Sequence, residues 1–407
     1  MSNEKNKTLI NRRSLFAATA ATAATVVVGS NLGSGVANAA PASYDIEPRG
    51  TIGRLERMPY LDLESLHDFT AGVRTWHSRN ASRAANARVT QIFKENGIDP
   101  NTDLPLKEVL ALIEHDPVVA MSGRLWISNQ QITWKVIADR FHANADKYLA
   151  EMESYDNRGP GSLELNPDLV IPEFAKYEIH IQPGGYVGDP FAGHIYHLGT
   201  NSFYHGVFPG GNDQDQIHIM AANNLPLPED GRVKRILDLG CGMGQFTTAL
   251  KERFPDAEVW GLDVGGPMVR YGHMRAIDIG VDVNFVQRLA EDTRFPNNYF
   301  DIVTSYIMHH ELPEEISKDV FREAHRIARP GGYYYPIDFR SARQAPRRTA
   351  YGLYRSWWDH RWNNERWRME FEALAFEDEM EKAGFRLNPD AKPAIRGFGI
   401  RHGVKPA

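Results

Sequence analysis

Cysteine is nearly absent from this chain of 407 residues, in which Cys241 is the single one. One thiol cannot form a disulfide within the chain, and a zinc site built from cysteines needs several of them. Both features are therefore excluded, and the cysteine content leaves the cellular compartment open.

Positive charge is also in short supply. The chain carries 46 Lys and Arg against 52 Asp and Glu, which gives a net charge of −6. Proteins that bind nucleic acid usually present a basic face, so this balance argues against a nucleic-acid partner. The hydrophobic share of 42% is that of a globular protein with a sizeable core.

Long hydrophobic runs are missing as well. The apolar run from Leu15 to Val28 has 14 residues, whereas a helix needs about 20 to span a bilayer. No apolar run of spanning length follows it, so we expect no stable membrane span.

The first 39 residues have the order of an export signal. Arg12 and Arg13 precede the Ala/Thr-rich apolar run, and the small residues "VANAA" follow, with cleavage expected after Ala39. The segment resembles a twin-arginine (Tat) signal peptide, a class that carries folded proteins across the bacterial inner membrane. The resemblance implies the Tat export machinery as a partner and a periplasmic or extracellular location, or a cytoplasmic one if the leader is not used. A chance arginine pair ahead of a tail is the alternative.

The next part of the chain is mainly helical in pattern. Residues 40–58 are polar and read as a linker, and apolar periodicity predicts helices at 61–96, 106–115 and 130–152, with Pro117 closing the second. Residues 154–225 are rich in Gly, Pro, His and Tyr, which is typical of functional loops. We therefore expect a helical N-terminal module with substrate-side and lid loops over residues 59–225.

From residue 232 onward, short apolar runs alternate with helical patterns, as in "VKRILDLG" followed by "QFTTALKERFP" and "EVWGLDV". This alternation predicts an α/β fold with a doubly wound, mainly parallel sheet. The predicted domain covers residues 226–407, with an insertion at about 341–366.

The first strand-to-helix turn of this domain reads "DLGCGMGQF", and ligands of such sheets bind outside the carboxyl ends of the strands. A dinucleotide-binding turn, G-x-G-x-x-G, would place its third glycine where this chain has Gln245. The carboxylate of Asp238 would also repel a pyrophosphate. The turn therefore suits a ligand that bears an amino group.

The turn and the segments that follow it resemble the class I S-adenosylmethionine-dependent methyltransferases. Besides the glycine turn, the likeness rests on "WGLDV", "QRLAEDTRFPNNYFDIVTSYIMHHEL", "EAHRIARPGGYYYPID" and "FEDEMEKAGFRL" in the family's order. It covers roughly residues 232–390 and is nearest to small-molecule methyltransferases of the ubiquinone/menaquinone type. The resemblance implies a Rossmann-like fold, S-adenosyl-L-methionine as the cofactor, and methyl transfer to a small molecule.

The resemblance also implies roles for individual residues. Asp238 would face the ammonium of the cofactor, Asp263 would accept hydrogen bonds from both ribose hydroxyls, and Ala290 and Glu291 would border the adenine. This chain has Leu289 where the family often has an aspartate, so recognition of the adenine amino group would fall to Glu291 or to the backbone. The full set implied for the cofactor is Asp238, Gly240, Cys241, Gly242, Gly244, Gln245, Asp263, Val264, Ala290, Glu291 and Tyr306.

The acceptor side is less defined. Methyl transfer from a sulfonium needs alignment and exclusion of water, and an oxygen or nitrogen nucleophile can also need a base. The candidates are His309 and His310 after the fourth strand of the domain, and Tyr204 and His205 in the lid-like stretch "NSFYHGVF". For the first histidine of the pair, a structural role is the alternative.

Two other functions remain open. The histidines of residues 180–218, with His194 and His197 as a pair, allow a metal-dependent enzyme, although the preferred interpretation includes no metal. A non-catalytic exported binding protein on the same fold is the second alternative. A homodimer is also left open.

The segment "YGLYRSWWDHRWNNERWRMEF" is unusually rich in tryptophan and arginine. Trp357, Trp358, Trp362 and Trp367 could line a pocket for an aromatic, apolar or cationic substrate. They could equally attach the insertion to the helical module, and the two roles are compatible.

Overall fold

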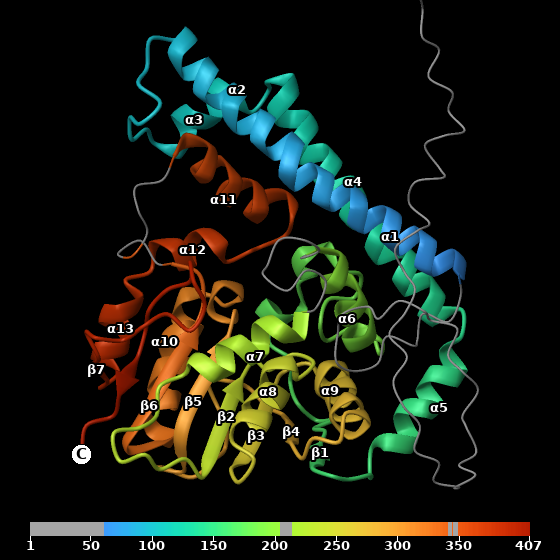
Figure 1. Ribbon diagram of the computed structural model, residues 1–407, viewed down its shortest axis with the longest axis vertical. Coiled ribbons are helices and arrows are strands. Elements are labelled where there is room, and N and C mark those ends of the chain that lie inside the picture. The colour runs from blue at the N-terminus through green and yellow to red at the C-terminus, as the bar shows by residue number, and fades with distance from the viewer. Residues whose placement is uncertain (1–60, 204–213, 341–343, 345–348) are drawn as a thin grey trace, which may run out of the picture. The chain divides into compact units, whose positions relative to one another are not determined.

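A computed structural model describes residues 61–203, 214–340, 344 and 349–407 (Figure 1). The leader, the linker, Tyr204 and His205 lie outside these residues. All described residues belong to one compact unit, residues 47–407. None of the helices in the described part combines the length and apolar character that crossing a membrane requires.

The centre of the unit is a single eight-stranded sheet with the order β1-β4-β3-β2-β5-β6-β8-β7. The strands are β1 (Ser162–Glu164), β2 (Arg235–Leu239), β3 (Glu258–Asp263), β4 (Asn284–Gln287), β5 (Phe300–Tyr306), β6 (Ala328–Ile337), β7 (Arg386–Leu387) and β8 (Gly403–Val404). Strands β1 to β6 are parallel, while β8 runs antiparallel to β6 and to β7. The doubly wound, mainly parallel sheet predicted from the sequence is confirmed. The edge strand β1 was not predicted.

Helices cover both faces of the sheet, since each strand buries side chains on two sides. One core contains Leu237 and Val303 with α10 (Glu314–Ile327) and α13 (Phe376–Lys382). The opposite core contains Ile236 and Ile302 with α7 (Gln214–Asn224) and α8 (Gln245–Arg253). Helix α9 (Gly266–Asp278) packs over β3 and β4.

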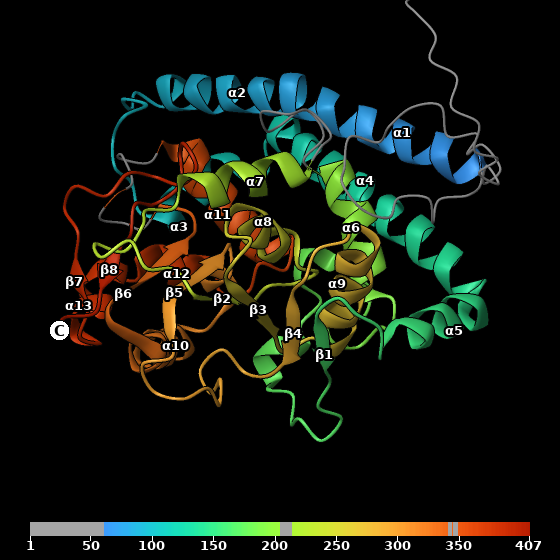
Figure 2. The same ribbon diagram turned by 60° about the horizontal axis from the view of Figure 1, so that its bottom comes forward.

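The N-terminal region forms a layer of helices, as expected. Figure 2 shows α1 (Leu61–Trp76) and α2 (Ser82–Glu95) running alongside α4 (Pro117–His142), with a π-helical turn at His77–Ala81 between the first two. The helix α3 is Leu106–Ile113 and α5 is Ala145–Tyr155.

Two boundaries in this layer were wrong. Pro117 does not close the second helix but is the first residue of α4. Proline is favoured at this position, because the N–H group of the first helical residue has no partner within the helix. Asp116 caps α4 by accepting hydrogen bonds from the backbone N–H groups of Val118 and Val119. The predicted helix 130–152 is in fact the second half of α4 followed by α5, with a break at residues 143–144.

The expectation of loops over 154–225 was also partly wrong. Besides the short 3-10 turns Glu173–Lys176 and Ile179–Ile181, this region contains α6 (Ala192–Phe203) and α7. Helix α6 was not predicted, because its histidines and glycines interrupt the helical pattern of apolar residues. Its apolar residues Ile195 and Leu198 are buried in one core cluster with Trp134 and Phe141.

Within the predicted insertion the described residues form α11 (Ala350–Trp362), and α12 (Arg368–Ala373) follows directly after it. In Figure 1, α11 lies between the helical layer and the rest of the unit, and it packs on α2 and α3. Trp358 is buried edge-on to Trp126 at 5.0 Å, and the hydroxyl groups of Tyr351 and Ser82 lie 3.1 Å apart. Trp358 therefore attaches the insertion to the helical layer, whereas Trp362 is 49% exposed.

Candidate functional site

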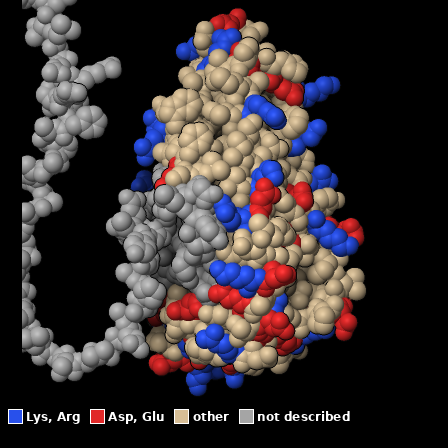
Figure 3. Space-filling model, turned by 90° about the vertical axis from the view of Figure 1, so that its right-hand side faces the viewer, with Lys and Arg blue, Asp and Glu red and all other residues tan. Residues whose placement is uncertain are grey.

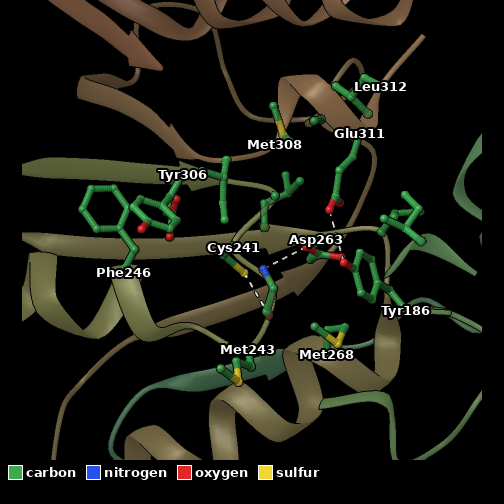
Figure 4. A pocket seen from close by; sticks show the side chains of 18 of the residues that line it. Tyr186, Cys241, Met243, Phe246, Asp263, Met268, Tyr306, Met308, Glu311 and Leu312 are labelled. Carbon is green, nitrogen blue, oxygen red and sulfur yellow. Dashed lines mark hydrogen bonds between the residues drawn. The ribbon is translucent and has the colours of Figure 1, made fainter. Parts of the chain in front are cut away.

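A pocket opens at the carboxyl ends of β2, β3 and β5 (Figure 4). Its lining comes from the turn after β2, the segments after β3, β4 and β5, and the region 174–218 of the chain. The lining residues are Phe174, Ala175, Ile179, Tyr186, Tyr196, Thr200, His218, Asp238, Gly240, Cys241, Gly242, Met243, Gln245, Phe246, Leu262, Asp263, Val264, Met268, Leu289, Ala290, Glu291, Tyr306, Ile307, Met308, Glu311, Leu312, Phe339 and Phe398.

The turn after β2 depends on glycine for two separate reasons. Gly240, Gly242 and Gly244 have positive φ values of 64°, 52° and 78°. A β-carbon on Gly244 would also lie 2.4 Å from the ring of Phe285, so close packing forbids a side chain there. Positive φ is readily adopted by glycine and is strained for other residues. The backbone of the turn can therefore border the pocket directly.

Asp263 ties this turn to the end of β3. Its carboxylate accepts hydrogen bonds from the backbone N–H of Gly242 at 2.9 Å and of Gly265 at 2.7 Å (Figure 4 draws the first). Burial raises the pKa of Asp263, and these backbone donors oppose the shift. Each carboxylate oxygen keeps a further lone pair for a ligand hydroxyl.

Asp238 is fully buried in the pocket lining at the end of β2. Its Oδ2 accepts a hydrogen bond from Thr247 Oγ1 at 2.7 Å, whereas its Oδ1 has no hydrogen-bond partner within the described part of the chain. Burial raises the pKa of this carboxyl to about 8, against the effect of Thr247. A buried carboxylate oxygen without a partner is costly, and a cationic group placed beside it would remove the cost.

The segment after β4 and the helix α7 complete the part of the pocket that contains Asp238 and Asp263. Leu289, Ala290 and Glu291 follow β4 and line the pocket together with Val264. Burial raises the pKa of Glu291. On the other side, the ring of Tyr306 lies 4.5 Å from that of His218 on α7.

The structure brings the predicted cofactor residues together. All of them line the pocket except Gly244, whose contact with Phe285 supports the turn from behind. Gln245 donates a hydrogen bond to Asp215, and Asp215 forms a buried ion pair with Arg275 at 2.7 Å. This pair was not predicted, because its two members lie 60 residues apart in the chain.

The side of the pocket facing the helical layer was largely missed. Tyr186 donates a hydrogen bond to Glu311 at 3.2 Å, and both side chains point into the pocket (Figure 4). Aromatic and apolar side chains complete this side, among them Phe174, Leu312 and Phe339. The one available signal was the position of Glu311 directly after the predicted His309–His310 pair.

His309 lies in the core rather than in the pocket lining. Its Nδ1 is 3.1 Å from Ser317 Oγ and its Nε2 is 2.6 Å from Tyr334 Oη, and it packs on Phe321 and Phe376. Burial lowers the pKa of His309 to about 3. Both ring nitrogens are thus engaged by hydroxyl groups, which suits a structural role.

His310 is also buried, but it lies beside the pocket residue Glu311. Its Nδ1 is 2.9 Å from Asp338 Oδ1, and its Nε2 is 3.9 Å from a carboxylate oxygen of Glu311 and of Glu365. Burial opposes the charged ring, but these carboxylates outweigh burial and raise the pKa of His310 to about 9. Burial likewise raises the pKa of Glu311 to about 8.

The paired histidines of α6 do not form a ligand set. His194 and His197 are buried, and His197 Nδ1 lies 2.6 Å from Tyr271 Oη while the ring of His194 packs on Tyr271 at 4.4 Å. Within the described residues, neither joins a group of three side chains that could hold a metal ion. The metal-dependent alternative therefore has no support from this pair.

The surface gives no sign of a nucleic-acid partner on the face drawn in Figure 3. Lys and Arg are interspersed there with Asp and Glu over the described residues. Such mixing is typical of a solvated surface rather than of a basic binding face.

Comparisons with known proteins match the part of the chain that contains the glycine turn. Residues 236–332 match the sequence profile of a family described as a methyltransferase domain. The ubiquinone/menaquinone biosynthesis C-methyltransferase of Burkholderia vietnamiensis is 37% identical over 122 residues, which are 30% of this chain and 49% of that protein. The chain thus spans about half the length of the curated relatives it matches.

Solved structures are similar over part of the chain. TnmH is 18% identical, with 53% of this chain and 58% of that one covered and a TM-score of 0.41. A TehB-like SAM-dependent methyltransferase of Corynebacterium glutamicum is 18% identical, with 47% and 87% covered and a TM-score of 0.32. The fold assignment itself rests on the observed strand order.

Proposed function

We propose that this protein transfers a methyl group from S-adenosyl-L-methionine to a small-molecule acceptor, because residues 236–332 match the profile of a methyltransferase domain. The observation that carries the proposal is Asp238. It is a fully buried carboxyl group at the end of β2 inside the matched segment, and one of its oxygens has no hydrogen-bond partner in the described ranges. An ammonium group is the ligand that this oxygen lacks.

The residues present fit the proposed cofactor. Asp238 would hold its ammonium group, and Asp263, anchored by Gly242 and Gly265, would accept hydrogen bonds from the ribose hydroxyls. Ala290 and Glu291 would border the adenine, with Leu289 as an apolar neighbour. The cofactor supplies an electrophilic methyl group when bound.

The chain's own contribution to the reaction is alignment and exclusion of water. Phe174, Leu312 and Phe339 give the acceptor side an apolar and aromatic character, which favours an acceptor of the same kind. Glu311, in hydrogen-bond contact with Tyr186, is the carboxylate placed to take a proton from an acceptor. His310 lies directly behind it, and Tyr204 and His205 stay predictions as further acceptor-side residues.

Isothermal titration calorimetry with S-adenosylhomocysteine tests the cofactor site. We expect saturable binding by the wild type and none by Asp238→Ala, whose circular dichroism should stay that of the wild type. Incubation with labelled S-adenosylmethionine and small-molecule extract then tests transfer. Binding without any labelled product would favour the non-catalytic binding protein instead.

We also propose that the protein is exported after folding by the Tat pathway. The proposal rests on the order of Arg12-Arg13, the apolar run and the small-residue cleavage pattern. A cofactor site filled in the cytosol would then travel with the folded protein. Replacing both arginines with lysine should keep the precursor in the cytoplasm, as judged by cell fractionation, and unchanged export would contradict this route.

A further inference from the structure

A second group of side chains lies beside the acceptor side of the pocket and is not used by the cofactor. His310, Glu311 and Glu365 place one ligand atom each within 4.8 Å of one another. His180 lies next to them, with its Nδ1 3.1 Å from Glu365 Oε1 and its Nε2 3.6 Å from Glu311 Oε1. We propose that His310, Glu311 and Glu365 bind a divalent transition-metal ion, with His180 beside the site.

The first support is the burial of two carboxyl groups beside histidines. Glu365 is only 6% exposed, and Glu311 is largely buried as well. Within the described residues, the ion-pair partners of these two side chains are the histidines His180 and His310, with no Lys or Arg within 4.0 Å. Metal ligands bind in their deprotonated form, so a divalent ion would replace the proton of His310 as the positive charge between these groups.

The second support is an unused ligand atom. Glu365 Oε2 is buried and has no hydrogen-bond partner among the residues that the structure describes. It lies 3.9 Å from His310 Nε2, and Glu311 Oε1 lies at the same distance from that nitrogen. These separations are too long for hydrogen bonds but resemble the spacing of ligand atoms around one ion. Ligands at about 2.1 Å from a metal lie within about 4.2 Å of each other, so the group would contract by roughly half an ångström.

The third support is the orientation of His310. Its Nδ1 is engaged by Asp338 Oδ1 at 2.9 Å. A histidine that binds a metal commonly donates its other ring N–H to a carboxylate, which fixes the ring and leaves the free nitrogen for the ion. Asp338 therefore positions His310 with Nε2 toward the two glutamates.

The fourth support is the backbone at His180. Its φ of 57° is unusual for a residue other than glycine and carries strain. The strained peptide is held from the helical layer, because its carbonyl accepts hydrogen bonds from Gln130 at 2.6 Å and Trp134 at 2.8 Å. Strain of this kind persists where the surrounding structure enforces it, often at functional sites.

One imidazole and two carboxylates suit zinc, manganese, iron or cobalt rather than magnesium or calcium, which prefer oxygen ligands alone. The proposed ion would lie beside the acceptor side, since Glu311 is itself part of the pocket lining (Figure 4). If the proposed methyl transfer is right, on which this last step rests, the acceptor is an acidic hydroxyl compound such as a phenol or catechol. Its O–H proton would pass to solvent, the S–CH3 bond would break and the O–CH3 bond would form.

The test measures metal on the full chain without any cofactor. Metal-free protein, prepared with a chelator, is titrated with Zn²⁺ and Mn²⁺, and bound metal is counted after gel filtration by elemental analysis. We expect one ion per chain for at least one of the two metals. A wild type that retains neither metal would overturn the proposal, while leaving the methyltransferase proposal untouched because that one is tested by cofactor binding.

Variants place the ion. Glu365→Gln and Glu311→Gln should weaken binding by at least roughly 100-fold, more than the loss of a supporting residue typically costs. The matched control is Glu372→Gln, since Glu372 is as buried as Glu365 and close to it in the chain but pairs with Arg368 at 3.0 Å. Equal binding by all three variants would refute this location. If the site variants fail to fold, anomalous diffraction from Zn²⁺-soaked wild-type crystals decides whether the ion lies between His310 and Glu365.

An experiment with Co²⁺ tests the proposed metal site and the proposed acceptor class independently. Co²⁺-loaded protein should show visible absorption bands, and catechol should shift them if the ion is open to the pocket. Bands that catechol leaves unchanged would overturn the acceptor class and keep the metal site.

Discussion

The two sides of the pocket differ in how the chain builds them. The cofactor side comes from consecutive strand ends of one sheet, with Asp238 and Asp263 at the ends of neighbouring strands β2 and β3. The acceptor side joins residues that lie far apart in the chain, as His180 and Glu365 do. The cofactor side of the pocket consists of local turns, so a sequence motif predicts it. The acceptor side consists of contacts between distant residues, so it depends on how the whole unit folds. The predictions below test this difference.

The largest effect is expected at Asp263. Asp263→Ala removes the acceptor of the proposed ribose hydroxyls, and hydrogen bonds to a charged group contribute about 1.5–3 kcal/mol each. Affinity for S-adenosylhomocysteine, measured by calorimetry, should fall at least about 100-fold. The control is Asp292→Ala, at an exposed position close by in the chain, which should bind like the wild type. Undiminished affinity of Asp263→Ala would refute the cofactor site.

Two glycine-to-alanine variants should show that side-chain packing and a positive φ each contribute separately to stability. Gly244→Ala meets both the ring of Phe285 at 2.4 Å and a φ of 78°, whereas Gly280→Ala has a φ of 73° with nothing within 4 Å. We expect the first to lower the free energy of unfolding by roughly 2–4 kcal/mol and the second by about 1 kcal/mol. Urea denaturation measures both, and equal losses would show that Phe285 plays no part.

Cofactor binding should depend on pH through Asp238. Its pKa is raised to about 8 by burial, so the free protein holds a proton there at neutral pH, and binding of an ammonium group expels it. Affinity should therefore rise with pH by up to about tenfold per unit and level off near pH 8. Calorimetry at pH 7 in buffers of different ionisation enthalpy should detect proton release. Binding that is independent of pH between 6 and 8 would contradict this linkage.

The smallest effect on the cofactor is expected from a change on the acceptor side. Gln130→Ala removes the hydrogen bonds to the His180 carbonyl and to Asn363, both at 2.6 Å. The free energy of unfolding should fall by about 1–3 kcal/mol because buried partners lose their bonds, while affinity for S-adenosylhomocysteine should stay within about twofold. Gln91→Ala, at an exposed position in α2, is the control for unfolding. A large loss of cofactor affinity would mean that the two sides are not independent.

The sheet and its cofactor side could be predicted from the sequence because they depend on short-range patterns. Apolar runs such as Arg235–Leu239 and Phe300–Tyr306 are buried strands, and their order follows from the alternation with helices. Asp238 and Asp263 end such strands, so their meeting at one edge follows from the parallel topology. The acceptor side gave no such pattern, and His309 and His310, adjacent in the chain, proved to have different surroundings.

By itself, the sequence determined the doubly wound sheet, the glycine turn and the place of the two aspartates, since strand periodicity and turn chemistry are local properties. Only the tertiary structure decided that α11 joins the helical layer, that α4 holds the carbonyl of His180, and that His180 meets Glu365 across 185 residues of chain. Contacts of this range are set by the packing of whole helices, and no spacing within the chain encodes them.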